Sequence, residues 1–150
     1  MSAYRTIVVG TDGSATSFAA VDRAAAVAGD SNAELVIVCA YTPTGRADTA
    51  EAEDILKDEA FLVRGWTPAE ETLRSAEDRA LAAGAGRVRT VAADGAPVEV
   101  LRKAVADADA DLLVVGNRGL DSLKGRLIGS VPADVTRRSS VDVLVVHTTG

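Results

Sequence analysis

Residues 111–119 read DLLVVGNRG, and after Leu120 to Ile128 the chain continues at residues 129–132 as GSVP. The apolar run before Gly116 predicts a short buried strand, and the run Val141–Val146 predicts a further strand beyond the loop. Between the two runs, the glycines lead the chain onto a helix start near Val131. Strand, helix and strand in this order predict a right-handed crossover and parallel pairing of the two strands.

The same alternation of strands and helices extends over the rest of the chain. Strands are predicted at Thr6–Gly10, Leu35–Ala40, Val88–Ala92, Leu112–Val115 and Val141–Val146. Helices are predicted at Ser17–Ala28, from Thr67 to about Ala83, at Ala96–Ala106 and at Val131–Arg138. We therefore expect one α/β domain over residues 1–150, a three-layer sandwich in which helices cover both faces of a five-stranded parallel sheet.

Two helix boundaries have specific signals. Gly29 is predicted to stop the helix that begins at Ser17. Thr67 is a predicted N-cap, with Pro68 in the first helical position and Glu70 completing a capping box, and this second helix is expected to stop at Gly84.

The segment Thr42–Trp66 breaks the alternation. It turns acidic after a Pro- and Gly-containing start, and Ile55, Leu56, Leu62 and Val63 could line one side of a short helix. Two interpretations stay open: a surface insertion, or a lid over a site.

Composition excludes several classes of function. The 150 residues carry a net charge of −6, and aromatic residues make up only 3%, so a basic or stacking surface for nucleic acid is not expected. One His and one Cys are too few for a zinc site, and Cys39 is expected to be a buried small apolar residue. No stretch is typical of a signal peptide or of a bilayer span, so we expect no membrane association and a cytoplasmic protein.

The glycine loop is the part of the sequence that predicts a ligand. Gly116 and Gly119 allow the backbone to approach an anion, while Gly129 and Ser130 place N–H groups and a hydroxyl at a predicted helix start, where the helix dipole favours negative charge. Arg118 could add a charge-assisted contact. No lysine follows Gly129, which excludes a Walker loop, and His147 stands where a response regulator would have lysine.

The spacing Gly-x2-Gly-x9-Gly-Ser, held in Gly116, Gly119, Gly129 and Ser130, resembles the nucleotide motif of the universal stress protein family. The similarity also covers the opening Ile7–Ser14, the run Asp111–Gly116 and the ending Val143–His147, and it is greatest to the actinobacterial-type members. Asp142 departs from the pattern, because many relatives have proline before the last strand.

The resemblance implies an adenine nucleotide alpha hydrolase-like fold with the sheet order 3-2-1-4-5. Strands one and four are then neighbours whose helices leave on opposite faces, and ligands bind at such a switch point. By position, the implied contacts to an adenine nucleotide come from the ends of strands one, two and four and from the glycine loop. These residues are Gly10, Thr11, Asp12, Val38, Cys39, Ala40, Gly116, Asn117, Arg118, Gly119, Gly129, Ser130 and Val131.

Asp12 has two interpretations. The resemblance implies that it faces the ribose, whereas an Asp before Gly-Ser also closes turns or caps a following helix. Ser14 and Thr16 are expected to be caps, and His147 is expected to be structural.

The function implied by the resemblance is adenine-nucleotide binding in stress response or signalling, with ATP, AMP or cyclic AMP as the ligand and Mg²⁺ only with a triphosphate. No catalytic residue and no metal ligand is predicted, because no nucleophile and base stand out. Alternatives are a slow ATPase or self-phosphorylating enzyme, and an interaction module with an empty site. An adenylating or thiolating enzyme on a related fold is disfavoured, because residues 11–14 read TDGS and lack the signatures of those enzymes.

The last predicted strand, Val141–Val146, has an apolar edge that is an aggregation hazard unless it is covered. The family pairs this strand between subunits, so the resemblance implies a homodimer.

Overall fold

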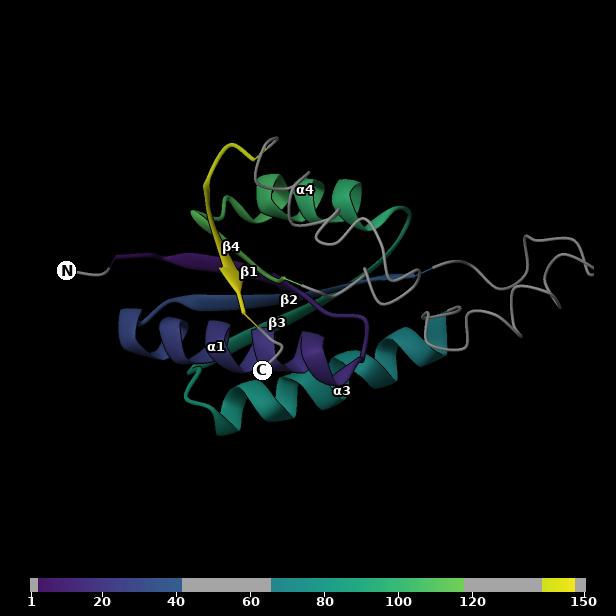
Figure 1. The fold of residues 1–150 in the computed structure, drawn as a ribbon, viewed down its shortest axis with the longest axis horizontal. Helices are drawn as coiled ribbons and strands as arrows, with labels where there is room; N and C mark the ends of the chain where they lie inside the picture. The colour runs from purple at the N-terminus through teal and green to yellow at the C-terminus, as the bar shows by residue number, and fades with distance from the viewer. Residues whose placement is uncertain (1–2, 42–65, 118–138, 148–150) are drawn as a thin grey trace, which may run out of the picture.

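The computed structural model describes residues 3–41, 66–117 and 139–147. Within them, the chain forms a parallel sheet in the order β3-β2-β1-β4-β5, as predicted (Figure 1). The elements are β1 (Thr6–Gly10), α1 (Ala15–Ser31), β2 (Glu34–Tyr41), α3 (Trp66–Ala82), β3 (Arg87–Asp94), α4 (Pro97–Ala108), β4 (Leu112–Gly116) and β5 (Asp142–Val146). The predicted helix at Val131–Arg138 and residues 42–65 of the acidic insertion lie outside the described residues.

Helices cover both faces of the sheet. α1 and α3 lie on one face and α4 lies on the other (Figure 1). In β1, Ile7 and Val9 belong to the core with α1 and α3, whereas Val8 belongs to the core with α4. All three side chains are fully buried, because successive residues of a strand point to opposite faces and both faces are covered. This is why the inner strands β1, β2 and β4 are nearly continuous apolar runs. Each buried branched side chain contributes about 1.5–3 kcal/mol of transfer free energy.

The predicted stop at Gly29 is wrong. α1 continues to Ser31 and ends at Asn32, which adopts the left-handed conformation with φ 56°. Gly29 is instead a packing residue, because a Cβ placed on it would lie 2.5 Å from the carbonyl oxygen of Gly84. Glycine at position 29 therefore reflects a tertiary contact with the end of α3, and the local rule that a glycine ends a helix does not apply to it.

Of the two predicted boundaries of α3, the N-terminal one is wrong and the C-terminal one is confirmed. The helix already includes Trp66, so Thr67 lies inside the helix and is not its N-cap. The predicted C-terminal stop is confirmed: α3 ends at Ala82, and Gly84 has a φ of +121° that L side chains rarely adopt. None of the described helices is long and apolar enough to cross a bilayer.

Candidate functional site

The neighbouring strands β1 and β4 separate at their carboxyl ends. Their pairing runs from Ile7 against Leu112 to Val9 against Val114. Beyond it, β1 still pairs with β2 through Gly10 and Val38, while β4 pairs with β5 through Gly116 and Val146. The chain leaves β1 toward α1 on one face, and α4 enters β4 from the other face. This is the switch point at which α/β sheets bind ligands.

The loop after β1 is ordered by its own polar groups. Thr11 and Ser17 are buried, and their hydroxyl oxygens are 2.8 Å apart. The Gly13 N–H donates to Thr11 Oγ1 at 3.1 Å, and Gly13 has a φ of +87° that favours glycine. The side chain of Thr11 is thus engaged within the loop, and its own N–H donates to the Val38 carbonyl at 2.9 Å.

Asp12 closes a turn, which confirms one of its two interpretations. Its Oδ1 accepts a hydrogen bond from the Ser14 N–H at 2.9 Å. Ser14 is the N-cap of α1, as expected, and its Oγ accepts from the Ser17 N–H at 3.2 Å. The expectation that Thr16 is a cap is wrong: it lies within α1, where its hydroxyl is 3.2 Å from Ser14 Oγ. The turn thus engages one carboxylate oxygen of Asp12, Oδ1.

At the end of β2, the backbone N–H and C=O of Ala40 face the point where β1 and β4 separate. Because Val38 C=O faces β1, the two-residue alternation of a strand turns the N–H and C=O of Ala40 to that side as well. The pairing of β1 with β2 ends at Val38, whereas β2 pairs with β3 as far as Tyr41. Ala40 therefore presents a donor and an acceptor next to each other where β1 has left the sheet.

Cys39 lies beside this edge, and its Sγ donates a weak hydrogen bond to the Ala40 carbonyl oxygen at 3.8 Å. Its thiol is fully buried in the core with α1 and α3, which confirms the interpretation as a small apolar residue. Burial first, and the negative charge of Asp12 second, raise the pKa of Cys39 to about 12. The pairing of Gly10 with Val38 and the hydrogen bond from Thr11 to Val38 place the ends of β1 and β2, nominated separately from the sequence, close together.

Gly10 has a packing role in this structure. A Cβ on Gly10 would lie 3.0 Å from Cδ2 of Leu101, so glycine lets α4 approach the end of β1 closely.

At the end of β4, the Asn117 N–H donates to the Val146 carbonyl at 2.9 Å, and Asn117 Nδ2 lies 3.4 Å from His147 Nδ1. His147 thus takes part in a contact between two strand ends, as a structural residue would. Gly116 and Asn117 begin the glycine loop, and its other nominated residues, Arg118, Gly119, Gly129, Ser130 and Val131, lie outside the described residues.

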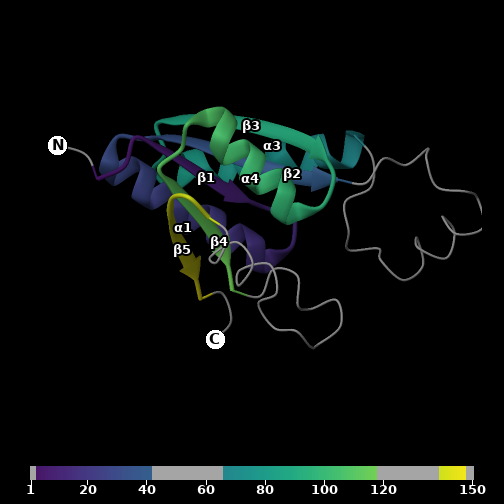
Figure 2. The ribbon, with the colours of Figure 1, turned by 90° about the horizontal axis from the view of Figure 1, so that it is seen from above.

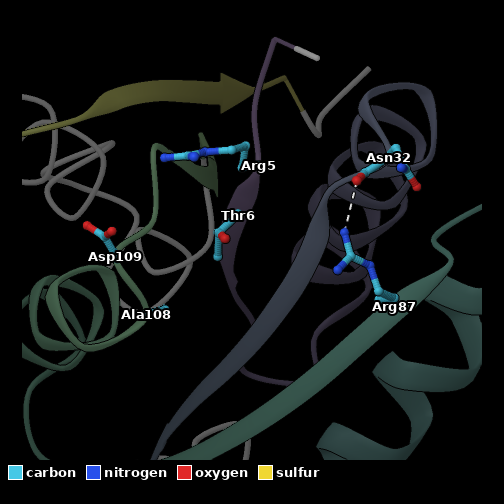
Figure 3. A pocket seen from close by; sticks show the side chains of 6 residues that line it. All are labelled: Arg5, Thr6, Asn32, Arg87, Ala108 and Asp109. Carbon is cyan, nitrogen blue, oxygen red and sulfur yellow. Dashed lines mark hydrogen bonds between the residues drawn. The ribbon is translucent and has the colours of Figure 1, made fainter. Parts of the chain in front are cut away.

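A hollow of about 420 Å³ lies at the opposite, amino-terminal ends of the strands. Its lining includes Arg5, Arg87 and Asp109 (Figure 3). Arg87 donates to the Asn32 carbonyl at 2.9 Å, at the negative end of the α1 dipole. Figure 3 shows Arg5 extending toward the side of Asp109 and away from Arg87, so the two guanidinium groups do not converge on one anion. We interpret this hollow as the space between capped helix ends. Among the described residues, no three His, Cys, Asp or Glu side chains are grouped to hold a metal ion.

Sequence reasoning missed Ser17. The pattern indicates only that it begins a helix, yet its hydroxyl contacts Thr11, Asp12 and Ser14. A run of hydroxyl residues within one turn of an Asp-Gly pair is the signal that the sequence offers, but it does not say which hydroxyl points inward.

This sheet order, with helices on both faces and polar loops at the β1–β4 switch point, defines an adenine nucleotide alpha hydrolase-like protein. The model of the Universal stress protein family matches residues 3–147, and the chain belongs to that family, in its actinobacterial type.

Three comparisons, two of them with the same protein, illustrate the similarity. Universal stress protein Rv1636 of Mycobacterium tuberculosis is 54% identical over 149 residues, covering 99% of this chain and 100% of that protein. A crystal structure of a universal stress protein in complex with cAMP has a TM-score of 0.77 and 47% identity, covering 99% of this chain and 100% of the other. The crystal structure of Rv1636 from Mycobacterium tuberculosis has a TM-score of 0.61 and 46% identity, covering 99% of both chains.

Proposed function

We propose that this protein binds an adenine nucleotide at the carboxyl ends of β1, β2 and β4 and acts in stress response or signalling. The observation that carries the proposal is the meeting of the Asp12 loop, the Ala40 amide and the start of the Gly116 loop where β1 and β4 part. The solved relative in complex with cAMP supports the same class of ligand.

Each of these groups suits one part of a nucleotide. The adjacent N–H and C=O of Ala40 match the acceptor N1 and the donor N6 of adenine. Asp12 Oδ2 can accept from a ribose hydroxyl, a charge-assisted bond worth about 1.5–3 kcal/mol. The backbone from Gly116 onward, with Arg118, Gly119, Gly129, Ser130 and Val131, is assigned to the phosphate.

The ligand is ATP, AMP or cyclic AMP. Isothermal titration calorimetry with each of the three, with and without Mg²⁺, tests the proposal and distinguishes them. Mg²⁺ should strengthen only the binding of ATP. Heats indistinguishable from dilution for all three nucleotides would contradict adenine-nucleotide binding and favour an interaction module with an empty site.

We propose a binding protein with at most slow turnover of ATP. One oxygen of Asp12 is engaged in a turn, and His147 contacts Asn117 at the ends of β4 and β5. Neither residue has the arrangement of a base beside a nucleophile. Incubation with radiolabelled ATP separates the alternatives. Release of phosphate at several turnovers per minute would show an ATPase, and incorporation of label into the protein would show a self-phosphorylating enzyme.

We further propose that the protein forms a homodimer through β5. This strand lies at the edge of the sheet, next to β4 (Figure 2), and Val145 is 40% exposed there. The opposite edge, β3, carries exposed Arg87 and Arg89, and Arg89 pairs with Glu34 of the adjacent strand at 3.4 Å. Charged side chains protect an edge from pairing, whereas an apolar edge favours it.

A further inference from the structure

The loop that carries Asp12 is tied together by one buried hydroxyl on α1. Ser17 is only 6% exposed, and its Oγ lies 2.8 Å from Thr11 Oγ1, 2.9 Å from the Ser14 carbonyl oxygen and 3.4 Å from the Asp12 backbone nitrogen. Three parts of the loop thus converge on a single atom from the first turn of the helix.

The direction of each hydrogen bond follows from counting protons. A serine hydroxyl has one proton, and Ser17 donates it to the Ser14 carbonyl, which has none to give. Thr11 must therefore donate to Ser17, and Thr11 Oγ1 then accepts from the Gly13 N–H at 3.1 Å. The chain of bonds runs from Gly13 through Thr11 and Ser17 to Ser14. Asp12 joins it through its own N–H, which donates to Ser17 Oγ at 3.4 Å.

We propose that Ser17 is a positioning residue for the ligand site: its hydroxyl holds the β1–α1 loop so that the Asp12 carboxylate is already set for a ribose hydroxyl. The inference rests on the proposed adenine-nucleotide function. The physical reason is preorganisation, because a loop that is ordered before binding loses less conformational entropy when the ligand arrives. Without the Ser17 hydroxyl, the Thr11 O–H loses its acceptor and the Asp12 N–H loses its contact at 3.4 Å. The Ser14 carbonyl then keeps only the helical bond from the Phe18 N–H.

The chain offers a matched control in Ser31. Ser31 lies in the last turn of the same helix and is 8% exposed, so Ser31→Ala removes the same hydroxyl at similar burial, remote from the loop. Ser17→Ala and Ser31→Ala are compared with the wild-type protein by thermal melting, so that a loss of binding is interpreted only for a folded variant.

Calorimetry with cyclic AMP tests the role in binding. Ser17→Ala should weaken the affinity about tenfold, as expected for one lost buried hydrogen bond, while Ser31→Ala should leave it within about twofold. In the background of Asp12→Ala, the Ser17→Ala substitution should cost less than about twofold, because the group it positions is gone. An equal loss in both backgrounds, or no loss in the wild-type background, would overturn the proposal.

A second measurement needs no ligand. Hydrogen exchange of the Gly13 and Ser14 amides should accelerate about tenfold or more in Ser17→Ala and not in Ser31→Ala, because these amides bond to Thr11 and Asp12. Uniform acceleration of all amides would indicate a general loss of stability and would contradict a positioning role. If the wild-type protein binds none of the three nucleotides, the proposed function fails, and hydrogen exchange alone decides whether Ser17 orders the loop.

Discussion

Gly29 in α1 lies directly against Gly84 at the end of α3, such that a Cβ at residue 29 would be 2.5 Å from the Gly84 carbonyl oxygen. No real Cβ comes that close to an oxygen atom, so the two backbones can touch here only because residue 29 is glycine. The contact sets how closely α1 and α3 lie together on their shared face of the sheet.

Gly29→Ala should destabilise the protein. Alanine improves helix propensity by up to about 1 kcal/mol, but forcing the helix ends apart costs about 1–3 kcal/mol, so a net loss is expected. Thermal melting should show a midpoint lower by a few degrees. Gly86→Ala is the control, because nothing lies within 4 Å of a Cβ there, and it should change the free energy of unfolding by less than about 0.5 kcal/mol. A melting point for Gly29→Ala at or above that of the wild type would contradict the packing role.

Cys39 should be unreactive in the folded protein. Its thiol is buried and its pKa is raised to about 12, so hardly any thiolate exists at pH 8. Ellman's reagent should label no thiol in the native state and one per chain after denaturation. Rapid labelling of the native protein would show that the side chain is accessible.

The same pKa predicts a pH dependence of stability. Because the pKa is raised from 9.0 to about 12 on folding, the folded protein retains a proton that the unfolded chain loses above pH 9. The free energy of unfolding should therefore fall as the pH rises from about 9 toward 12. Relative to Cys39→Ala, the wild-type protein should lose about 1 kcal/mol between pH 8 and pH 10 in urea unfolding. A difference that stays constant over this range would contradict the prediction.

Asp12→Asn should weaken binding of cyclic AMP about tenfold or more while the fold persists. The amide oxygen can still accept from the Ser14 N–H, but the charge that strengthens a bond to a ribose hydroxyl is lost. Calorimetry gives the affinity. Asp30→Asn, in the exposed last turn of α1, removes the same charge away from the site and should bind as the wild type does. Equal affinities for all three proteins would assign Asp12 to the turn alone.

Gly116→Val should abolish detectable binding of all three nucleotides. Gly116 is the last residue of β4 and opens the loop assigned to the phosphate, and a branched side chain there blocks close approach of an anion to the backbone. Circular dichroism and melting establish that the variant is folded. Unchanged affinity in a folded variant would show that this glycine only shapes a turn.

Val145→Lys should convert the proposed dimer into a monomer, because it places a charge on the exposed apolar edge of β5. Thr90→Lys makes the corresponding change on the exposed side of the opposite edge strand, β3, and should leave the oligomeric state unchanged. Sedimentation velocity at micromolar concentration distinguishes the two states. A wild-type protein that sediments as a monomer would defeat the proposal of a dimer.

Local pattern was enough to predict the strands. The predicted strand Thr6–Gly10 matches β1, and the prediction for β2 falls one residue short at each end. This accuracy has a physical cause: strands covered on both faces must be apolar throughout, so their limits are visible in composition. The sheet order, in contrast, was predicted from the family resemblance, because no local pattern specifies which strands become neighbours.

Boundaries that depend on contacts between elements were less predictable. Gly29 resembled a stop because a glycine that admits a neighbouring backbone and one that ends a helix are the same residue in sequence. Thr67 resembled an N-cap for a similar reason, since a Thr-Pro pair is equally compatible with the first turn of a helix that has already begun.

Hydrophobic periodicity, a local property of the chain, predicted the α/β class and the buried strands, and glycine spacing predicted the anion loop. The other candidate ligand residues came from the family resemblance. The folded structure was needed to show that Gly10 and Gly29 serve packing, that Thr11 turns its hydroxyl inward, and that Ser17 contacts the loop around Asp12. These roles depend on which atoms of distant or folded-back segments come within a few ångströms of one another, and that proximity is a property of the assembled fold.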